Sequence, residues 1–181
     1  EFYTDQMQID AHERVILERE LRSALKAGEF ILHYQPQIDI LSRRVIGVEA
    51  LIRWQHPTRG LIPPNLFIPI AEATGLIIPM GEWVIHEACH QLATWRLMGY
   101  QNLSMAVNLS ARQFFQKDLL ETIEKALETS GIPAEKLEFE ITESMVIANA
   151  EEAIDTLQKM KHIGLQLSID DFGTGYSTLS Y

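Results

Sequence analysis

The sequence predicts an α/β fold in which strands alternate with helices, arranged as a barrel or as a doubly wound sheet. Three observations support this class. Residues 104–109, 137–142 and 166–170 have the alternating apolar pattern of strands, and helical patterns separate them. A glycine follows each helical stretch, where it can end the helix. One set of alternating strand positions is apolar and the other is polar, so the two faces of the sheet meet different surroundings.

The N-terminal part is predicted to form a helix and a hairpin. Residues 10–27 place apolar side chains among Glu and Arg and are followed by Gly28, as in an amphipathic helix with a C-terminal stop. Residues 30–38 and 44–54 have the pattern of strands joined by a turn at 39–43. Because this connection is short, we expect antiparallel pairing.

The middle of the sequence is rich in proline. Pro63, Pro64 and Pro69 are expected to break this region into short pieces. A helix is then predicted from about residue 82 to residue 98, with Gly99 as its stop.

The C-terminal half repeats a strand followed by a helix. After the first of these strands, Ser110 and Gln113 form a capping box, and one helix is expected from there to Gly131. After the second strand, Asn149 can cap a helix that ends at Gly164. This alternation implies parallel pairing of the strands.

The polar face of the strands carries several ionisable groups. Its members are Ala106, Asn108, Ser110, Glu138, Glu140, Thr142, Gln166, Ser168 and Asp170, with Glu49 and Arg53 in phase on the earlier strand. Burial of several carboxylates on one enclosed face is costly unless cations or hydrogen bonds compensate them. We therefore expect a metal site on this face.

The candidate ligands lie near the carboxyl ends of their strands, where barrels gather their functional groups. Asn108, Glu140 and Asp170 hold these positions. Oxygen donors favour Mg²⁺ or Mn²⁺ over zinc. The adjacent pair Asp170 and Asp171 could serve two neighbouring ions, which indicates hydrolysis of a phosphate ester.

Composition limits the classes of protein to which the chain can belong. The chain has 181 residues, of which 46% are hydrophobic, so it can bury a substantial core. Its 15 Lys and Arg against 25 Asp and Glu give a net charge of −10, which argues against binding of a DNA or RNA polymer. Cys89 is the one cysteine, so no intramolecular disulfide is expected, and a cytoplasmic location fits best. The apolar runs are too short to span a bilayer, so any membrane anchor would lie outside this chain.

Five motifs together resemble the EAL-domain cyclic-di-GMP phosphodiesterases. They are YQP at 34–36, EALIRW at 49–54, VNLS at 107–110, EITE at 140–143 and DDFGTGYS at 170–177. The resemblance covers residues 28–181, which we predict to be part of an EAL domain, with residues 1–27 as a linker and helix before it. It implies a modified TIM barrel with an antiparallel first strand. The implied reaction is hydrolysis of one phosphodiester bond of cyclic-di-GMP to linear pGpG, in bacterial second-messenger signalling.

The resemblance also implies roles for single residues. The ligands of two Mg²⁺ or Mn²⁺ ions would be Glu49, Asn108, Glu140, Asp170 and Asp171, and the catalytic set would be Glu49, Asp170 and Asp171. The substrate would be bound by Gln35, Leu51 and Arg53, with Arg53 on a phosphate. Glu143 would anchor the loop of residues 171–177.

The barrel of this family continues beyond residue 181, since TIM barrels run to roughly 250 residues. The continuation is expected to carry a lysine on the next strand, a later glutamate and a glutamine. We therefore expect the full domain to be the enzyme. The 181-residue chain alone is expected to be an incomplete barrel, inactive, and either poorly folded or self-associating.

The segment before the domain is similar to the linker of tandem GGDEF-EAL signalling proteins, with Tyr3, Thr4 and the charged helix at the junction. The expected partners are cyclic-di-GMP, a second copy in a homodimer through the EAL domain, and an adjoining GGDEF or sensor domain.

Two alternatives belong to other functional classes. One is a catalytically inactive receptor for cyclic-di-GMP, or a regulatory interaction module, with the same fold. The other is a zinc protease, because His86, Glu87 and His90 match the pattern HExxH. The helical stripe of Val84, Ala88 and other apolar residues puts both histidines on the opposite face, and no third ligand is evident nearby, so we reject the zinc site.

Overall fold

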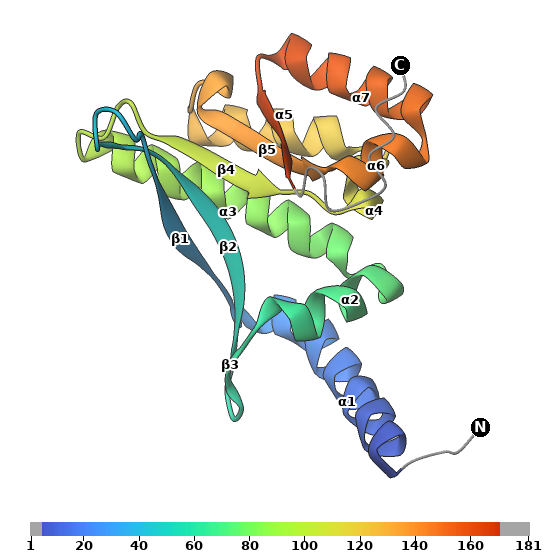
Figure 1. The fold of residues 1–181 in the computed structure, drawn as a ribbon. Coiled ribbons are helices and arrows are strands. Elements are labelled where there is room, and N and C mark those ends of the chain that lie inside the picture. Colours follow the sequence, from blue (N-terminus) through green and yellow to red (C-terminus); the bar gives the residue numbers. More distant parts are fainter. Residues whose placement is uncertain (1–4, 171–181) are drawn as a thin grey trace.

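In the part of the chain that the structure describes, six strands form one sheet, around which the helices are arranged (Figure 1). The structure is a computed structural model that describes residues 5–170. The strands are β1 (Phe30–Ile38), β2 (Val45–His56), β3 (Gly60–Ile62), β4 (Ser104–Asn108), β5 (Leu137–Thr142) and β6 (Gln166–Asp170). They are ordered β1-β2-β4-β5-β6, with β3 paired to β2. The pairs β1–β2 and β2–β3 are antiparallel and the others are parallel, so the predicted hairpin and the predicted parallel pairing are confirmed.

Helices connect and cover these strands. They are α1 (Asp5–Ala27), α2 (Pro64–Thr74), α3 (Ile77–Leu97), α4 (Ala111–Phe114), α5 (Leu119–Ser130), α6 (Glu143–Ala148) and α7 (Ala150–Ile163), with a 3₁₀ turn η1 (Ala134–Lys136) before β5. Within the described range, no helix is both long enough and apolar enough to cross a lipid bilayer.

The alternation of side chains on the strands follows the predicted pattern. Met105 and Val107 of β4 and Phe139 of β5 are at most 1% exposed and pack in one core with α3, α5 and α7. Asn108 and Glu140, which have the opposite parity, are exposed and half-buried on the other face. The helices therefore cover one face, and the polar side chains lie on the opposite one.

A second core lies where α1, α2 and the start of α3 meet the antiparallel strands. Leu21 and Ala24 of α1 are at most 1% exposed there, beside the fully buried Trp54 of β2. Ile52 and Trp83 are half-buried and pack against both cores. These two side chains therefore join the two halves of the described structure.

Polar contacts also attach α1 to β2. Glu20 Oε2 lies 3.5 Å from His56 Nε2 and 3.4 Å from Arg59 Nε. Trp54 Nε1 donates a hydrogen bond of 2.9 Å to Glu29 Oε2, just after the helix. The C-terminal part of α1 is thus fixed to the outer side of the hairpin by burial and by charge.

The prediction that the prolines break residues 63–74 into short pieces is wrong. Pro63 precedes α2 and Pro64 is its first residue, where no backbone N–H is needed. Pro69 lies inside the helix, but burial of Phe67 and Ile70 on its apolar face maintains the helix.

The following helix begins earlier than expected. It starts at Ile77 instead of residue 82, because Pro79 falls in the first turn, where proline is tolerated. Its buried stripe includes Val84, Ala88 and Leu92, in agreement with the predicted pattern.

The single helix expected between Ser110 and Gly131 is two helices, so that prediction is also wrong. The capping box is present and begins α4, which has only four residues, and α5 starts after Asp118. In one continuous helix, Leu119 would lie about 140° around the axis from Phe114. Since both side chains are buried, the break lets both face the core.

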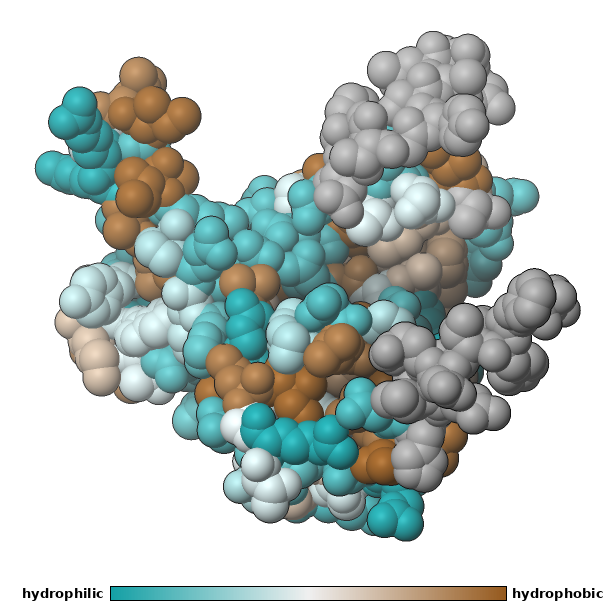
Figure 2. Space-filling view, turned by 60° about the horizontal axis from the view of Figure 1, so that its bottom comes forward, coloured by the Kyte–Doolittle hydropathy of each residue, from teal (hydrophilic) through white to brown (hydrophobic). Residues whose placement is uncertain are grey.

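The turn between β1 and β2 projects from the sheet, at the upper left of Figure 2, where apolar and hydrophilic surfaces lie side by side. Ile40 and Leu41 at this turn are 88% and 94% exposed, and Arg43 and Arg44 follow them. Asp39 accepts a hydrogen bond of 2.7 Å from the backbone N–H of Ser42, as is common in tight turns.

Candidate active site

Five neighbouring strands of the sheet carry the predicted metal-binding and substrate-binding residues that the structure describes. Gln35 of β1 is opposite Glu49 of β2, and Asn108 of β4 is opposite Glu140 of β5. Glu140 is in turn opposite Ser168 of β6. Between β2 and β4 the register puts Glu49 opposite Ala106, two residues before Asn108, so these groups form a row across the sheet that is offset by two residues at this point.

Three side chains from successive strands meet at the centre of this row. Asn108 Nδ2 donates to Glu49 Oε1 over 2.7 Å. Glu140, on the next strand, lies near enough to Glu49 for that carboxyl group to raise its pKa. The predicted convergence of Glu49, Asn108 and Glu140 is thus seen in the geometry.

Glu140 has an unusual protonation equilibrium. Burial and, after it, the negative charges of Glu49, Asp170 and Glu138 together raise its pKa from 4.5 to about 7. Asp170, the last residue of β6, is therefore close enough to act on this carboxyl group.

The donor set fits a divalent cation by its chemistry. The carboxylates of Glu49 and Glu140 and the amide of Asn108 supply only oxygen ligands, which hard ions such as Mg²⁺ and Mn²⁺ prefer. The buried hydroxyl of Ser168 has no hydrogen-bond partner among the described residues. Within residues 5–170, no group of three or more His, Cys, Asp or Glu side chains is arranged to hold a metal ion. The fifth predicted ligand, Asp171, lies outside the described residues.

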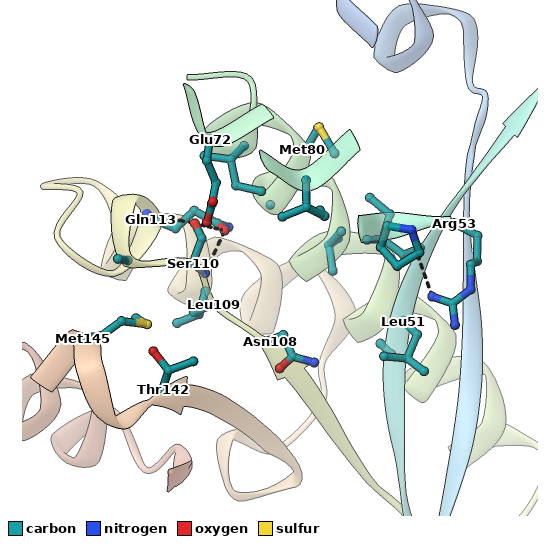
Figure 3. Close-up of a pocket in the computed structure, with 18 of the residues that line it drawn as sticks. Leu51, Arg53, Glu72, Met80, Asn108, Leu109, Ser110, Gln113, Thr142 and Met145 are labelled. Carbon is teal, nitrogen blue, oxygen red and sulfur yellow. Dashed lines mark hydrogen bonds between the residues drawn. The ribbon is translucent and has the colours of Figure 1, made fainter. Parts of the chain in front are cut away.

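A pocket of about 500 Å³ opens beside this group (Figure 3). Leu51 and Arg53 come to it from β2, Asn108 from the end of β4, and Thr142 from the end of β5. Most of the remaining wall is apolar and comes from α2, α3 and α6, including Met80. The pocket therefore joins apolar surface to a small number of polar groups, as ligand sites commonly do.

Of the predicted substrate-binding residues, Leu51 and Arg53 line the pocket. Arg53 is half-buried, and its Nη1 donates to the carbonyl oxygen of Ile52 over 2.9 Å, which leaves other guanidinium N–H groups for a ligand. Gln35 is exposed on the same face as Glu49 but is not part of the pocket wall.

Glu143 is the first residue of α6, directly after Thr142 of the pocket wall. The loop of residues 171–177 that it is expected to anchor lies outside the described residues. Its predicted role as an anchor therefore stays a prediction.

Several residues of this site were not singled out from the sequence. Glu72, Gln113, Ser144 and Met145 line the pocket, and Ser168 lies in the row of polar groups. Ser168 has the parity of the polar face, and Gln113 belongs to the predicted capping box, which marks the start of a helix but not a place in the pocket. Glu72, Gln113, Ser144 and Met145 reach the pocket from helices, whose packing the strand pattern does not predict.

Comparison with known proteins relates this chain to one family. The family model described as EAL domain matches residues 18–181. MucR of Pseudomonas aeruginosa, named a bifunctional diguanylate cyclase/cyclic di-GMP phosphodiesterase, is 43% identical over 180 residues, which are 99% of this chain and 26% of MucR. PdeR of Escherichia coli, named a cyclic di-GMP phosphodiesterase, is 42% identical over 178 residues, or 98% of this chain and 27% of PdeR. The chain thus spans about a quarter of the length of these curated relatives.

Solved structures agree with the fold. A MucR phosphodiesterase in complex with c-di-GMP superimposes with a TM-score of 0.86 at 44% identity, over 90% of this chain and 66% of that one. The FimX EAL domain of Xanthomonas citri, also in complex with c-di-GMP, gives a TM-score of 0.80 at 25% identity, over 93% of this chain and 65% of that one. The fold is therefore α/β and TIM-barrel-like with an antiparallel first pair of strands, as the sequence predicts. By its family match and its fold, the chain belongs to the EAL domain family.

Proposed function

We propose that this domain, in its complete form, hydrolyses cyclic-di-GMP to linear pGpG in a reaction that depends on Mg²⁺ or Mn²⁺. The observation that carries the proposal is the cluster of Glu49, Asn108 and Glu140 on the neighbouring strands β2, β4 and β5, beside a pocket that contains Arg53. The names of MucR and PdeR support the choice of substrate.

Two ions would be held by Glu49, Asn108, Glu140, Asp170 and Asp171. Such ions, when bound, activate the attacking water and neutralise charge that develops on the phosphoryl group. The negative charge of Glu49 helps to raise the pKa of Glu140, and a cation held by these residues would offset that charge.

The substrate-binding roles follow from position and chemistry. The guanidinium of Arg53 would hold a phosphate through two N–H groups and so orient the phosphorus toward the carboxylate cluster. Leu51 and the apolar wall would pack against the nucleoside, and Gln35 would reach the substrate from β1. In the reaction, the oxygen of water forms a bond to phosphorus while the P–O3′ bond breaks, and the leaving O3′ gains a proton.

In the full-length protein, the domain would act as one part of a larger signalling protein. Its relatives are much longer than this chain, and the region before it would be joined through α1. An adjoining GGDEF or sensor domain, a homodimer through this domain, and a cytoplasmic site of action belong to the same proposal.

The test is an assay of the full-length protein with cyclic-di-GMP and Mn²⁺ or Mg²⁺, with the linear product followed by chromatography. We expect metal-dependent product, a loss of at least about 100-fold in kcat for Glu49→Ala and Asn108→Ala, and normal turnover for Glu135→Gln. Glu135 is an exposed acid of η1, before β5 begins, and serves as the matched control. Tight binding of cyclic-di-GMP without product would instead make the domain a receptor.

A further inference from the structure

The side chain of Gln113 connects the short helix α4 to the residues that follow β4. Gln113 is only 5% exposed, and its Oε1 accepts hydrogen bonds from the backbone N–H of Ser110 at 3.2 Å and from Ser110 Oγ at 2.7 Å. Ser110 comes two residues after Asn108, which ends the strand. Gln113 therefore fixes the backbone immediately beyond Asn108.

Gly81 of α3 provides the space that Gln113 occupies. A Cβ atom at Gly81 would lie only 1.5 Å from Gln113 Nε2, so any side chain at this position would displace the amide. Glycine inside a helix is less favourable than alanine. Its presence at a buried position of α3 is explained by this close contact.

A second contact holds α4 from another direction. Arg112 Nη1 donates to the carbonyl oxygen of Glu72, near the end of α2, over 2.6 Å. In Figure 3, Gln113, Ser110 and Glu72 lie together at one side of the pocket, and Asn108 lies at the end of the strand that leads to them. On the other side of that strand end, the backbone N–H of Leu109 donates to the carbonyl oxygen of Glu140 over 3.0 Å.

We propose that Gln113, seated on Gly81, is a positioning residue for the metal site. By fixing the end of β4 against α3, it holds the Asn108 amide in the orientation that donates to Glu49. This inference rests on the proposed function, because Asn108 and Glu49 are proposed ligands. Gln113 itself is not one of the proposed ligands.

The experiment compares Gln113→Ala, Gly81→Ala, their double variant and Gln113→Glu in the full-length protein. For each, the Mn²⁺ dissociation constant, kcat, KM and Tm are measured. We expect Gln113→Ala and Gly81→Ala to weaken Mn²⁺ binding by about 10–100-fold, with a matching fall in kcat and little change in KM. Gln113→Glu keeps the acceptor for Ser110 and should restore most of the affinity.

The double variant separates positioning from a structural role. The methyl group added at residue 81 fills the volume that Gln113→Ala empties, so Tm should recover while Mn²⁺ affinity stays low. The matched control is Ala126→Gly in α5, a buried position of a helix that has no residue in the pocket wall, and it should lower Tm without a change in Mn²⁺ affinity.

The proposal is overturned if Gln113→Ala lowers Tm but keeps the wild-type Mn²⁺ affinity and kcat. If the wild-type protein neither binds Mn²⁺ nor forms product, the proposed function fails, and positioning is then judged by a crystal structure of Gln113→Ala. A retained hydrogen bond between Asn108 Nδ2 and Glu49 Oε1 would overturn the inference, and a broken one would support it.

Discussion

At the scale of single residues, the informative feature is a carboxyl group that is only partly ionised at neutral pH. Glu140 is held beside Glu49, with Asp170 and Glu138 near enough to raise its pKa to about 7 together with burial. Such crowding destabilises a protein without a cation, so the residues that suit the proposed chemistry carry a cost in the metal-free state.

This cost should appear as a dependence of stability on pH. The folded-state pKa of Glu140 lies above its unfolded value, so the stability linked to its protonation is full below about pH 4.5 and is lost as pH rises through about 7. Glu140→Gln removes the titration. In the presence of a chelator, the difference in Tm between variant and wild type should therefore shift in favour of the variant between pH 5 and pH 8, as measured by thermal unfolding. A difference that does not change with pH would contradict the assigned cause.

At the scale of elements, α1 is attached to the outer side of β2 by buried side chains and by a charged contact. Glu20 meets His56 and Arg59 with its side chain 29% exposed and His56 7% exposed. By contrast, Glu18 and Arg22 of the same helix form an exposed pair at 3.4 Å. Glu18 and Glu20 therefore differ in their contacts: Glu18 pairs within its own helix, whereas Glu20 contacts residues outside it.

This difference predicts unequal effects of two matched substitutions. Glu20→Ala should destabilise the protein by about 1 kcal/mol and speed amide hydrogen exchange in α1, since His56 and Arg59 lose their carboxylate. Glu18→Ala should cost at most about 0.5 kcal/mol. Urea unfolding and hydrogen exchange by mass spectrometry measure both effects. Equal exchange in the two variants would show that Glu20 does not fasten the helix.

Elements also differ in how well the sequence predicts them. The bounds of β1, β5 and β6 agree with prediction because alternation of apolar and polar side chains marks both ends of a strand. Helix bounds are predicted less well where a proline suggests a break. In α2 the helix continues through Pro69, because its apolar face is buried.

The sequence likewise predicts only part of the candidate site. That Glu49, Asn108 and Glu140 share one face follows from parity along each strand, but their mutual contacts depend on the order of the strands in the sheet. The contact of Gln113 with Gly81 depends on how α4 packs against α3, which no local pattern in either segment encodes.

At the scale of the whole molecule, two hydrophobic cores are joined by a small number of side chains. Trp83 contacts both cores, whereas Trp95 packs only against the one beneath the parallel strands. Since small domains unfold as one unit when their parts are well coupled, Trp83 should be important for cooperativity.

Replacement of the two tryptophans tests this coupling. Trp83→Ala should lower stability by up to about 3 kcal/mol and separate the unfolding of the two cores, so that fluorescence and far-ultraviolet circular dichroism no longer give the same urea midpoint. Trp95→Ala should lower stability but keep the two midpoints together. Coincident transitions in Trp83→Ala would mean that Ile52 and the backbone of β2 suffice to couple the cores.

Strand β2 has different neighbours on its two faces. Its outward side chains Trp54 and His56 are tied to Glu29 and to Glu20, while its inward side chains Glu49 and Arg53 serve the cluster and the pocket. Because successive side chains of a strand point to opposite faces of the same backbone, a displacement of α1 would also move the strand that carries Glu49 and Arg53. The N-terminal helix is thus connected to the proposed site through a single β-strand.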